Sequence, residues 1–214
     1  MKPAVKPRAV GSHAPRRARA AESFRTAAEC IGEVGPGMSL FAITRGQFSM
    51  IDAIQHCLAA AGPSAVSVWT WTLEDYEAEI LAALHHDERI LSGTLVIDQA
   101  ARKINGSSIA RWRESYGDAS VRYASSHAKM ATIEGGGLKI LLRGSMNLNK
   151  NPRIEQLDIT EGGPDFDLVR ELEHDLVVLP IDANISEIVA SSRTGSKPKS
   201  MEFPAFKSLK VWKK

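Results

Sequence analysis

Two short polar clusters within residues 125–155 contain the side chains that phosphate chemistry needs. His127 and Lys129 are two residues apart, so on an extended strand both side chains point to the same face. After an apolar run the chain reads GSMN at residues 144–147, where a small turn can present backbone N–H groups, a hydroxyl and an amide to a ligand. A histidine can serve as nucleophile or base, while lysine and asparagine hold negative oxygens. Together the two clusters predict a site for a phosphate ester.

The chain between the two clusters predicts a hairpin that brings them together. Residues 121–132 read as one strand carrying His127 and Lys129, and residues 138–143 (LKILLR) read as an apolar core strand. They are joined through Glu134 and a turn of three consecutive glycines. Paired strands of this kind place both polar clusters at one edge of a sheet.

The order of these residues resembles the signature of the phospholipase D superfamily. The matching residues are His127-Ala-Lys129, then four residues to an acid at Glu134, then Gly144-Ser145-Met146-Asn147. The family usually has Asp where this chain has Glu134, and the gap to Gly144 is longer than its commonest spacing. The resemblance covers about 30 residues strongly.

The resemblance implies a mechanism with a covalent intermediate and with no metal or cofactor. His127 would attack the phosphorus of a phosphodiester and form a phosphohistidine, and a second histidine would protonate the leaving oxygen and then activate water. Lys129 and Asn147 would bind the nonbridging oxygens, with Ser145 assisting.

Two acids complete the site that the resemblance implies. Glu134 would orient Lys129 or the motif loop, and its extra methylene relative to Asp would shift such contacts by about an ångström, which can cost about 100-fold in rate. Glu155 follows the Asn after a short loop, at the place of a further family acid, and would orient the imidazole of His127.

The chain contains a single copy of the motif. Family members with two copies pair them within one chain, and members with one copy form a homodimer that brings two histidines together across a two-fold axis. An active enzyme therefore predicts a homodimer.

The charge is concentrated at the two ends of the chain. Residues 1–25 and residues 193–214 each carry seven Lys or Arg against one Glu, whereas residues 26–192 carry 13 basic and 23 acidic residues. We expect a basic disordered N-terminal tail (1–25), a phospholipase D-like domain (26–192) and a basic C-terminal tail (193–214). The tails predict contact with a polyanion such as DNA or RNA, and solvated ends are the alternative.

Apolar periodicity predicts the elements that must position the site. Alternating or continuous apolar runs predict strands at residues 38–45, 65–73 and 90–98, and helical spacing predicts helices at residues 47–61, 74–87, 107–116 and 165–176. Strands that alternate with helices indicate an α/β fold with a mostly parallel sheet covered by helices on both faces.

Composition narrows the class of protein. The 214 residues are 43% hydrophobic and 24% charged, which is typical of a globular chain, and no apolar run approaches the ~18 residues that span a membrane. With no apolar signal-peptide core and two cysteines that we expect to be buried, we predict a cytoplasmic protein without a membrane partner. Trp69 and Trp71 share one side of a strand, where core packing is favoured over base stacking.

The first functional hypothesis is a metal-independent nuclease, a hydrolase that cleaves DNA or RNA through a phosphohistidine on His127. The second is a non-catalytic nucleic-acid-binding or assembly module of the same fold. The third is a phospholipase or another phosphodiesterase. Cleavage that resists EDTA and is lost on His127→Ala separates the first hypothesis from the second, and lipid turnover without DNA cleavage would favour the third.

Overall fold

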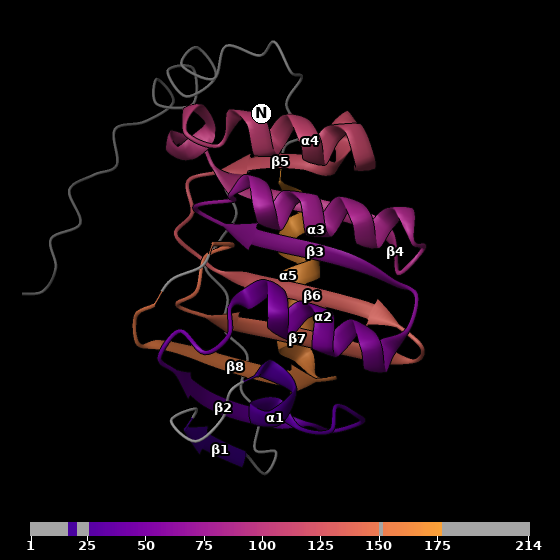
Figure 1. Ribbon diagram of the computed structural model, residues 1–214. Helices are drawn as coiled ribbons and strands as arrows, with labels where there is room; N and C mark the ends of the chain where they lie inside the picture. The colour runs from indigo at the N-terminus through magenta and orange to yellow at the C-terminus, as the bar shows by residue number, and fades with distance from the viewer. Residues whose placement is uncertain (1–16, 21–25, 150–151, 177–214) are drawn as a thin grey trace, which may run out of the picture. The chain divides into compact units, whose positions relative to one another are not determined.

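The computed structural model describes residues 17–20, 26–149 and 152–176, and these form one mixed α/β unit around a single sheet (Figure 1). The chain divides into two units, residues 1–181 and 182–214, and the described residues all belong to the first. The strands within the described ranges are β1 (Arg17–Ala20), β2 (Ser39–Thr44), β3 (Ser64–Thr70), β4 (Ile90–Asp98), β5 (Val121–Ala124), β6 (Met130–Gly135), β7 (Leu138–Gly144) and β8 (Glu155–Glu161).

Five α-helices lie within the same ranges: α1 (Ala27–Ile31), α2 (Met50–Ala61), α3 (Asp75–His86), α4 (Gly106–Tyr116) and α5 (Pro164–Asp175). Short 3₁₀ helices follow β4 at Ala100–Lys103 and precede β5 at Asp118–Ser120. Local sequence explains several boundaries. Ser49 and Asp52 form a capping box at the start of α2, and Gly62 ends that helix with a φ of 71°. Pro164 opens α5, where its missing N–H costs no hydrogen bond.

The strand order in the sheet is β1-β2-β8-β7-β6-β3-β4-β5. The pairs β1–β2, β3–β4 and β4–β5 are parallel, and the four pairings that involve β6 or β8 are antiparallel. The α/β class is therefore confirmed, but the expected mostly parallel sheet is a mixed one. The difference arises because β6, β7 and β8 follow one another as a meander inserted between β2 and β3, and consecutive short connections force antiparallel pairing.

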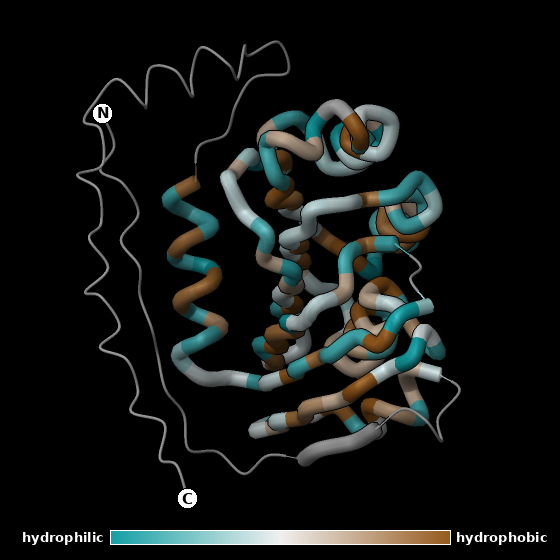
Figure 2. The backbone as a smooth tube through the Cα atoms, turned by 90° about the vertical axis from the view of Figure 1, so that its left-hand side faces the viewer, coloured by the Kyte–Doolittle hydropathy of each residue, from teal (hydrophilic) through white to brown (hydrophobic). Residues whose placement is uncertain are grey.

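Helices cover both faces of the sheet, as expected. Figures 1 and 2 show α5 alone on one face, with the other helices against the opposite face. Under α5 lies a core cluster that includes Trp69, Leu141 and Phe166, and Figure 2 shows the alternation of apolar and polar residues along this helix. Each fully buried side chain of this size contributes roughly 1.5–3 kcal/mol to folding before entropy is counted.

The segment 121–132, which we expected to be one strand, is two strands separated by residues 125–129. β5 pairs with β4 at the end of the sheet, whereas β6 pairs with β3 and β7. The chain must therefore leave the sheet after Ala124 and pass over the ends of β4 and β3 before it re-enters. As a result His127 and Lys129 lie in a loop before β6 rather than on a strand.

Predictions for the ends of the chain fall largely outside the described residues. Of the expected N-terminal tail, Arg17–Ala20 form β1, which pairs with β2, and residues 1–16 and 21–25 are not described. The C-terminal tail also lies outside. Among the described residues no helix combines the length and apolar character needed to cross a membrane. Cys30 and Cys57 are buried, as expected, and burial raises the pKa of the Cys57 thiol to about 12.

Candidate active site

One edge of the sheet collects all the residues that we predicted to act on a phosphate. The strand directions place the C-terminal ends of β3, β4 and β7 at the same edge as the first residues of β6 and β8. The hairpin register confirms the expected convergence, because Met130 pairs with Arg143 and the Gly144 N–H donates to the Lys129 carbonyl at 3.1 Å. The His127 loop and the 144–147 turn are thus neighbours through the backbone.

His127 and Lys129 are in direct contact. The Lys129 Nζ lies 3.2 Å from the His127 Nδ1 and 3.4 Å from its Nε2, and it donates to the His127 carbonyl at 2.8 Å. Lys129 is buried, whereas His127 is exposed. The Lys129 ammonium can attract the negative oxygens of a phosphodiester, and the exposed His127 imidazole beside it is then accessible to the phosphorus.

Asp98, at the end of β4, holds the loop that carries this pair. Its buried carboxylate accepts the Ala100 N–H at 2.8 Å and the Ser126 N–H at 2.9 Å, so it ties the loop to the sheet edge. The Ser126 hydroxyl then accepts the Ala128 N–H at 3.1 Å, which closes a local turn between His127 and its neighbours. Asp98 therefore positions the His127 loop from the adjacent strand.

The turn after β7 is fixed against β8. A Cβ on Gly144 would lie 2.2 Å from the Gln156 carbonyl oxygen, so only glycine permits this approach. The Ser145 hydroxyl accepts the Gln156 N–H at 3.0 Å and donates to the buried carboxylate of Glu155. The Ser145 proton is therefore engaged by Glu155, and the role of Ser145 at a phosphate stays a prediction.

Asn147 links the turn to the end of β3. Its Oδ1 accepts the Trp71 N–H at 3.3 Å and lies 3.5 Å from the Thr70 hydroxyl. Using the oxygen in this way leaves the amide NH₂ as the end that can donate to a ligand oxygen. Asn147 is half-buried at the same edge as the His127 loop.

The two predicted acids occupy different places. Glu155 lies at the start of β8, and its negative charge acts on the Lys129 ammonium, so it belongs to the site. Orientation of His127 by Glu155 stays a prediction, and the Glu155 carboxylate accepts a hydrogen bond from the Ser145 hydroxyl. Glu134 is exposed near the far end of β6, opposite Lys139 and about 13 Å along the strand from Met130. It is not placed to orient Lys129, contrary to our expectation.

Burial and charge oppose each other at Lys129. Burial, the larger influence, lowers the pKa of the ammonium, because removal from water penalises the charged form. The carboxylate of Glu155 partly offsets this lowering. A negative phosphate oxygen bound beside Lys129 would further stabilise the charged form of this buried lysine.

Trp71 lies at the candidate site, although we expected it to pack in the core beside Trp69. Trp69 is buried as expected, but β3 ends at Thr70, and Trp71 lies half-buried with its ring centroid 6.4 Å from that of His127. Alternation along a strand no longer applies once the strand has ended. Asp98 was also missed, although an acid that closes an apolar strand was a visible signal.

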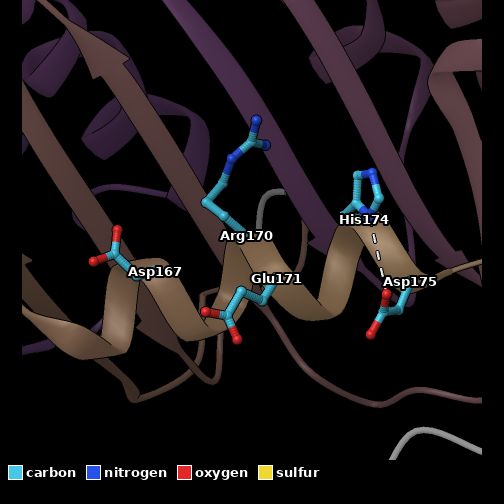
Figure 3. A pocket seen from close by; sticks show the side chains of 5 residues that line it. All are labelled: Asp167, Arg170, Glu171, His174 and Asp175. Carbon is cyan, nitrogen blue, oxygen red and sulfur yellow. Dashed lines mark ion pairs between the residues drawn. The ribbon is translucent and has the colours of Figure 1, made fainter.

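Two recesses described by the structure lie away from these residues. One of about 650 Å³ runs along the outer side of α5 between Asp167 and Asp175, and Figure 3 shows its side chains projecting from that helix. Another of about 310 Å³ lies between the start of α2 and the start of α3, lined by Gln47, Phe48 and Tyr76 among others. Within the described ranges, no three His, Cys, Asp or Glu side chains are grouped so as to hold a metal ion.

Comparisons with known proteins identify no family. No family model matches the chain, and no curated protein matches it. Among solved structures the chain is similar to TrmBL2, described as an archaeal chromatin protein with a novel mode of DNA binding, with a TM-score of 0.44 and 9% identity. That match covers 65% of this chain and 54% of TrmBL2, about half of its length. A likeness this weak does not establish a shared fold.

Proposed function

We propose that this chain is a metal-independent phosphodiesterase of the phospholipase D type, and that it cleaves nucleic acid through a phosphohistidine on His127. The observation that carries the proposal is the contact between the exposed His127 and the buried Lys129, with 3.2 Å between Nζ and Nδ1, at the sheet edge that also carries Asn147. The signature resemblance supports the same assignment, and with it a phospholipase D-like identity for the α/β fold.

The proposed reaction has two displacement steps. A ring nitrogen of His127 forms a bond to phosphorus while the bond from phosphorus to the leaving oxygen breaks, and a second histidine gives that oxygen a proton. Lys129 and Asn147 hold the nonbridging oxygens while negative charge develops on them. In the second step that same histidine takes a proton from water, whose oxygen displaces His127 from phosphorus.

The second histidine comes from another copy of the chain in this proposal. One motif per chain supplies one nucleophile, and a symmetric homodimer would place two His127 side chains across its axis. Light scattering tests the state of the full chain in solution. Mixing wild-type subunits with an excess of His127→Ala subunits should lower the activity per wild-type subunit, because a mixed dimer holds only one of the two histidines that the shared site needs.

Nucleic acid is the substrate that the charge distribution favours. The seven basic residues in each end of the chain would contact phosphates along a strand of nucleic acid. Residues 26–192 carry a net acidic charge, so the two basic ends supply most of the attraction for a polyanion, and Lys129 holds it at the site.

The test is cleavage of plasmid and single-stranded DNA and RNA in excess EDTA, by the wild type and by His127→Ala. His86→Ala is a matched control, because His86 is exposed at the end of α3, far along the sequence from the motif. We expect cleavage by the wild type and by the control, and none by His127→Ala. Nucleic-acid binding without cleavage would instead favour a non-catalytic binding module, and lipid turnover alone would favour a phospholipase.

A further inference from the structure

Trp71 differs from the two other tryptophans that the structure describes. Trp69 and Trp112 are buried, and their indole N–H groups donate to Glu173 and to Ser120 inside the protein. Trp71 is half-buried, and its ring lies beside that of His127 with the planes tilted by 51°. Core packing therefore explains the first two tryptophans but leaves the third unexplained.

The backbone of Trp71 is held from both sides. Its N–H donates to the Asn147 Oδ1 at 3.3 Å, and its carbonyl accepts from the Asn105 Nδ2 at 3.3 Å. Asn105 is buried and also bonds the Leu73 N–H at 2.9 Å and the Ala101 carbonyl at 2.8 Å. The backbone that carries the indole ring is thus held at the edge where His127 and Asn147 lie.

We infer that Trp71 stacks on an unpaired base next to the phosphodiester that His127 acts on, so that the substrate is single-stranded nucleic acid. This inference rests on the proposed function. The ring is adjacent to His127, and in a nucleotide the base lies one sugar away from its phosphate. Stacking on an aromatic ring needs an open base face, which a strand has when it is unpaired. A base within a duplex has both faces covered by its neighbours.

The test compares oligonucleotides that differ only in their bases. Full-length wild type, Trp71→Ala and Trp71→Phe are assayed on a single-stranded oligonucleotide, its duplex, and an abasic strand with the same sugar-phosphate backbone. For Trp71→Ala we expect kcat/KM on the single strand to fall about 5- to 150-fold, the range set by base–aromatic stacking, with no change on the abasic strand. Trp71→Phe retains a flat ring and should recover most of the loss.

Tyr76→Ala is the matched control, because Tyr76 is an exposed aromatic residue at the start of α3 and is not among the motif residues. It should leave all three rates unchanged. Equal losses on the single and abasic strands, or a preference for the duplex, would overturn the stacking role while leaving the nuclease proposal intact.

Binding separates the two proposals when no cleavage is seen. If the oligonucleotide quenches the tryptophan fluorescence of the wild type and Trp71→Ala abolishes that quenching, the stacking contact stands and the catalytic proposal fails. Turnover of choline phospholipid that depends on Trp71, with no effect of Trp71 on oligonucleotides, would overturn the nucleic-acid assignment.

Discussion

The two ends of β6 differ in almost every property that matters for chemistry. At its start, Lys129 is buried against His127, and its carbonyl bonds the turn after β7. At its end, Glu134 is exposed opposite Lys139, and the chain turns back through glycines against the end of α2. One end is a network of polar side chains from several strands, and the other is a solvated hairpin turn.

This difference shows that the motif residues from His127 to Glu134 do not form one cluster, because they lie at both ends of β6. The residues that can contact a phosphate gather at one end of β6, about 13 Å along the strand from Glu134. A Glu in place of Asp at position 134 therefore has room in solvent for its extra methylene. Substitutions at the two ends should consequently have different effects on activity, and the following predictions test that difference.

The largest difference is expected between two lysines on the same hairpin. Lys129→Met should lower kcat/KM by about 100- to 1,000-fold, because it removes the charge that meets the nonbridging oxygens. Lys139→Met, at the other end, removes an exposed lysine paired with Asp167 and should change the rate less than about two-fold. Steady-state kinetics on one oligonucleotide compares them, and similar losses in the two variants would contradict a site confined to one end.

Substitutions of two glycines, one at each end of the hairpin, should have similar effects on stability but different effects on activity. An added Cβ would lie 2.2 Å from the Gln156 carbonyl oxygen at Gly144, and 2.3 Å from that of Ala61 at Gly136, which also has a φ of +55°. Each change to alanine should cost roughly 1–3 kcal/mol of unfolding free energy, measured in urea. Only Gly144→Ala should also lower kcat of the folded fraction, because it displaces the turn that carries Asn147. Loss of kcat in Gly136→Ala would refute this separation.

The pH profile should report on Lys129. The Lys129 amine must be protonated to hold phosphate oxygens, and burial lowers its pKa. Activity should therefore be lost, as the pH rises, at a lower pH than that at which an exposed lysine loses its proton. Lys129→Arg keeps its charge over this range and should move the alkaline limit upward, even if its rate is lower. An unchanged limit in Lys129→Arg would assign the alkaline limb to another group.

The smallest effect is expected at Glu134. Glu134→Gln should change kcat/KM by less than about two-fold, since an exposed side chain at the distal end has no route to the site other than the strand itself. Glu134→Asp, which introduces the residue usual in the superfamily that the motif resembles, should give no gain. A loss of ten-fold or more in either variant would show that this end of β6 acts on the site.

Much of the framework was predictable from the residues because apolar periodicity is local. The strand at 90–98 and the helices near 47–61 and 165–176 appear within a few residues of their expected places. Convergence of His127 and Asn147 also followed from the glycine turn between two short strands. These features depend on contacts between residues that are close in sequence.

The rest depends on pairings that sequence spacing does not encode. Nothing in residues 121–132 marks the point at which the chain leaves β4 and crosses to β3, so one strand was expected in place of two. The loop that results is held by Asp98 from an earlier strand, and Trp71 lies beside His127 only because β3 ends at Thr70. β8, which supplies Glu155, was not foreseen because only two of its seven residues, Leu157 and Ile159, are apolar.

The most direct test of the central claim is to trap the covalent intermediate. The full-length protein would be mixed with an oligonucleotide in EDTA and quenched rapidly at alkaline pH, where phosphohistidine survives, and its peptides would be analysed by mass spectrometry. The account predicts a nucleotide adduct on the peptide containing His127, absent in His127→Ala and present in His86→Ala. Cleavage with an adduct on another residue, or cleavage by His127→Ala at the wild-type rate, would contradict it.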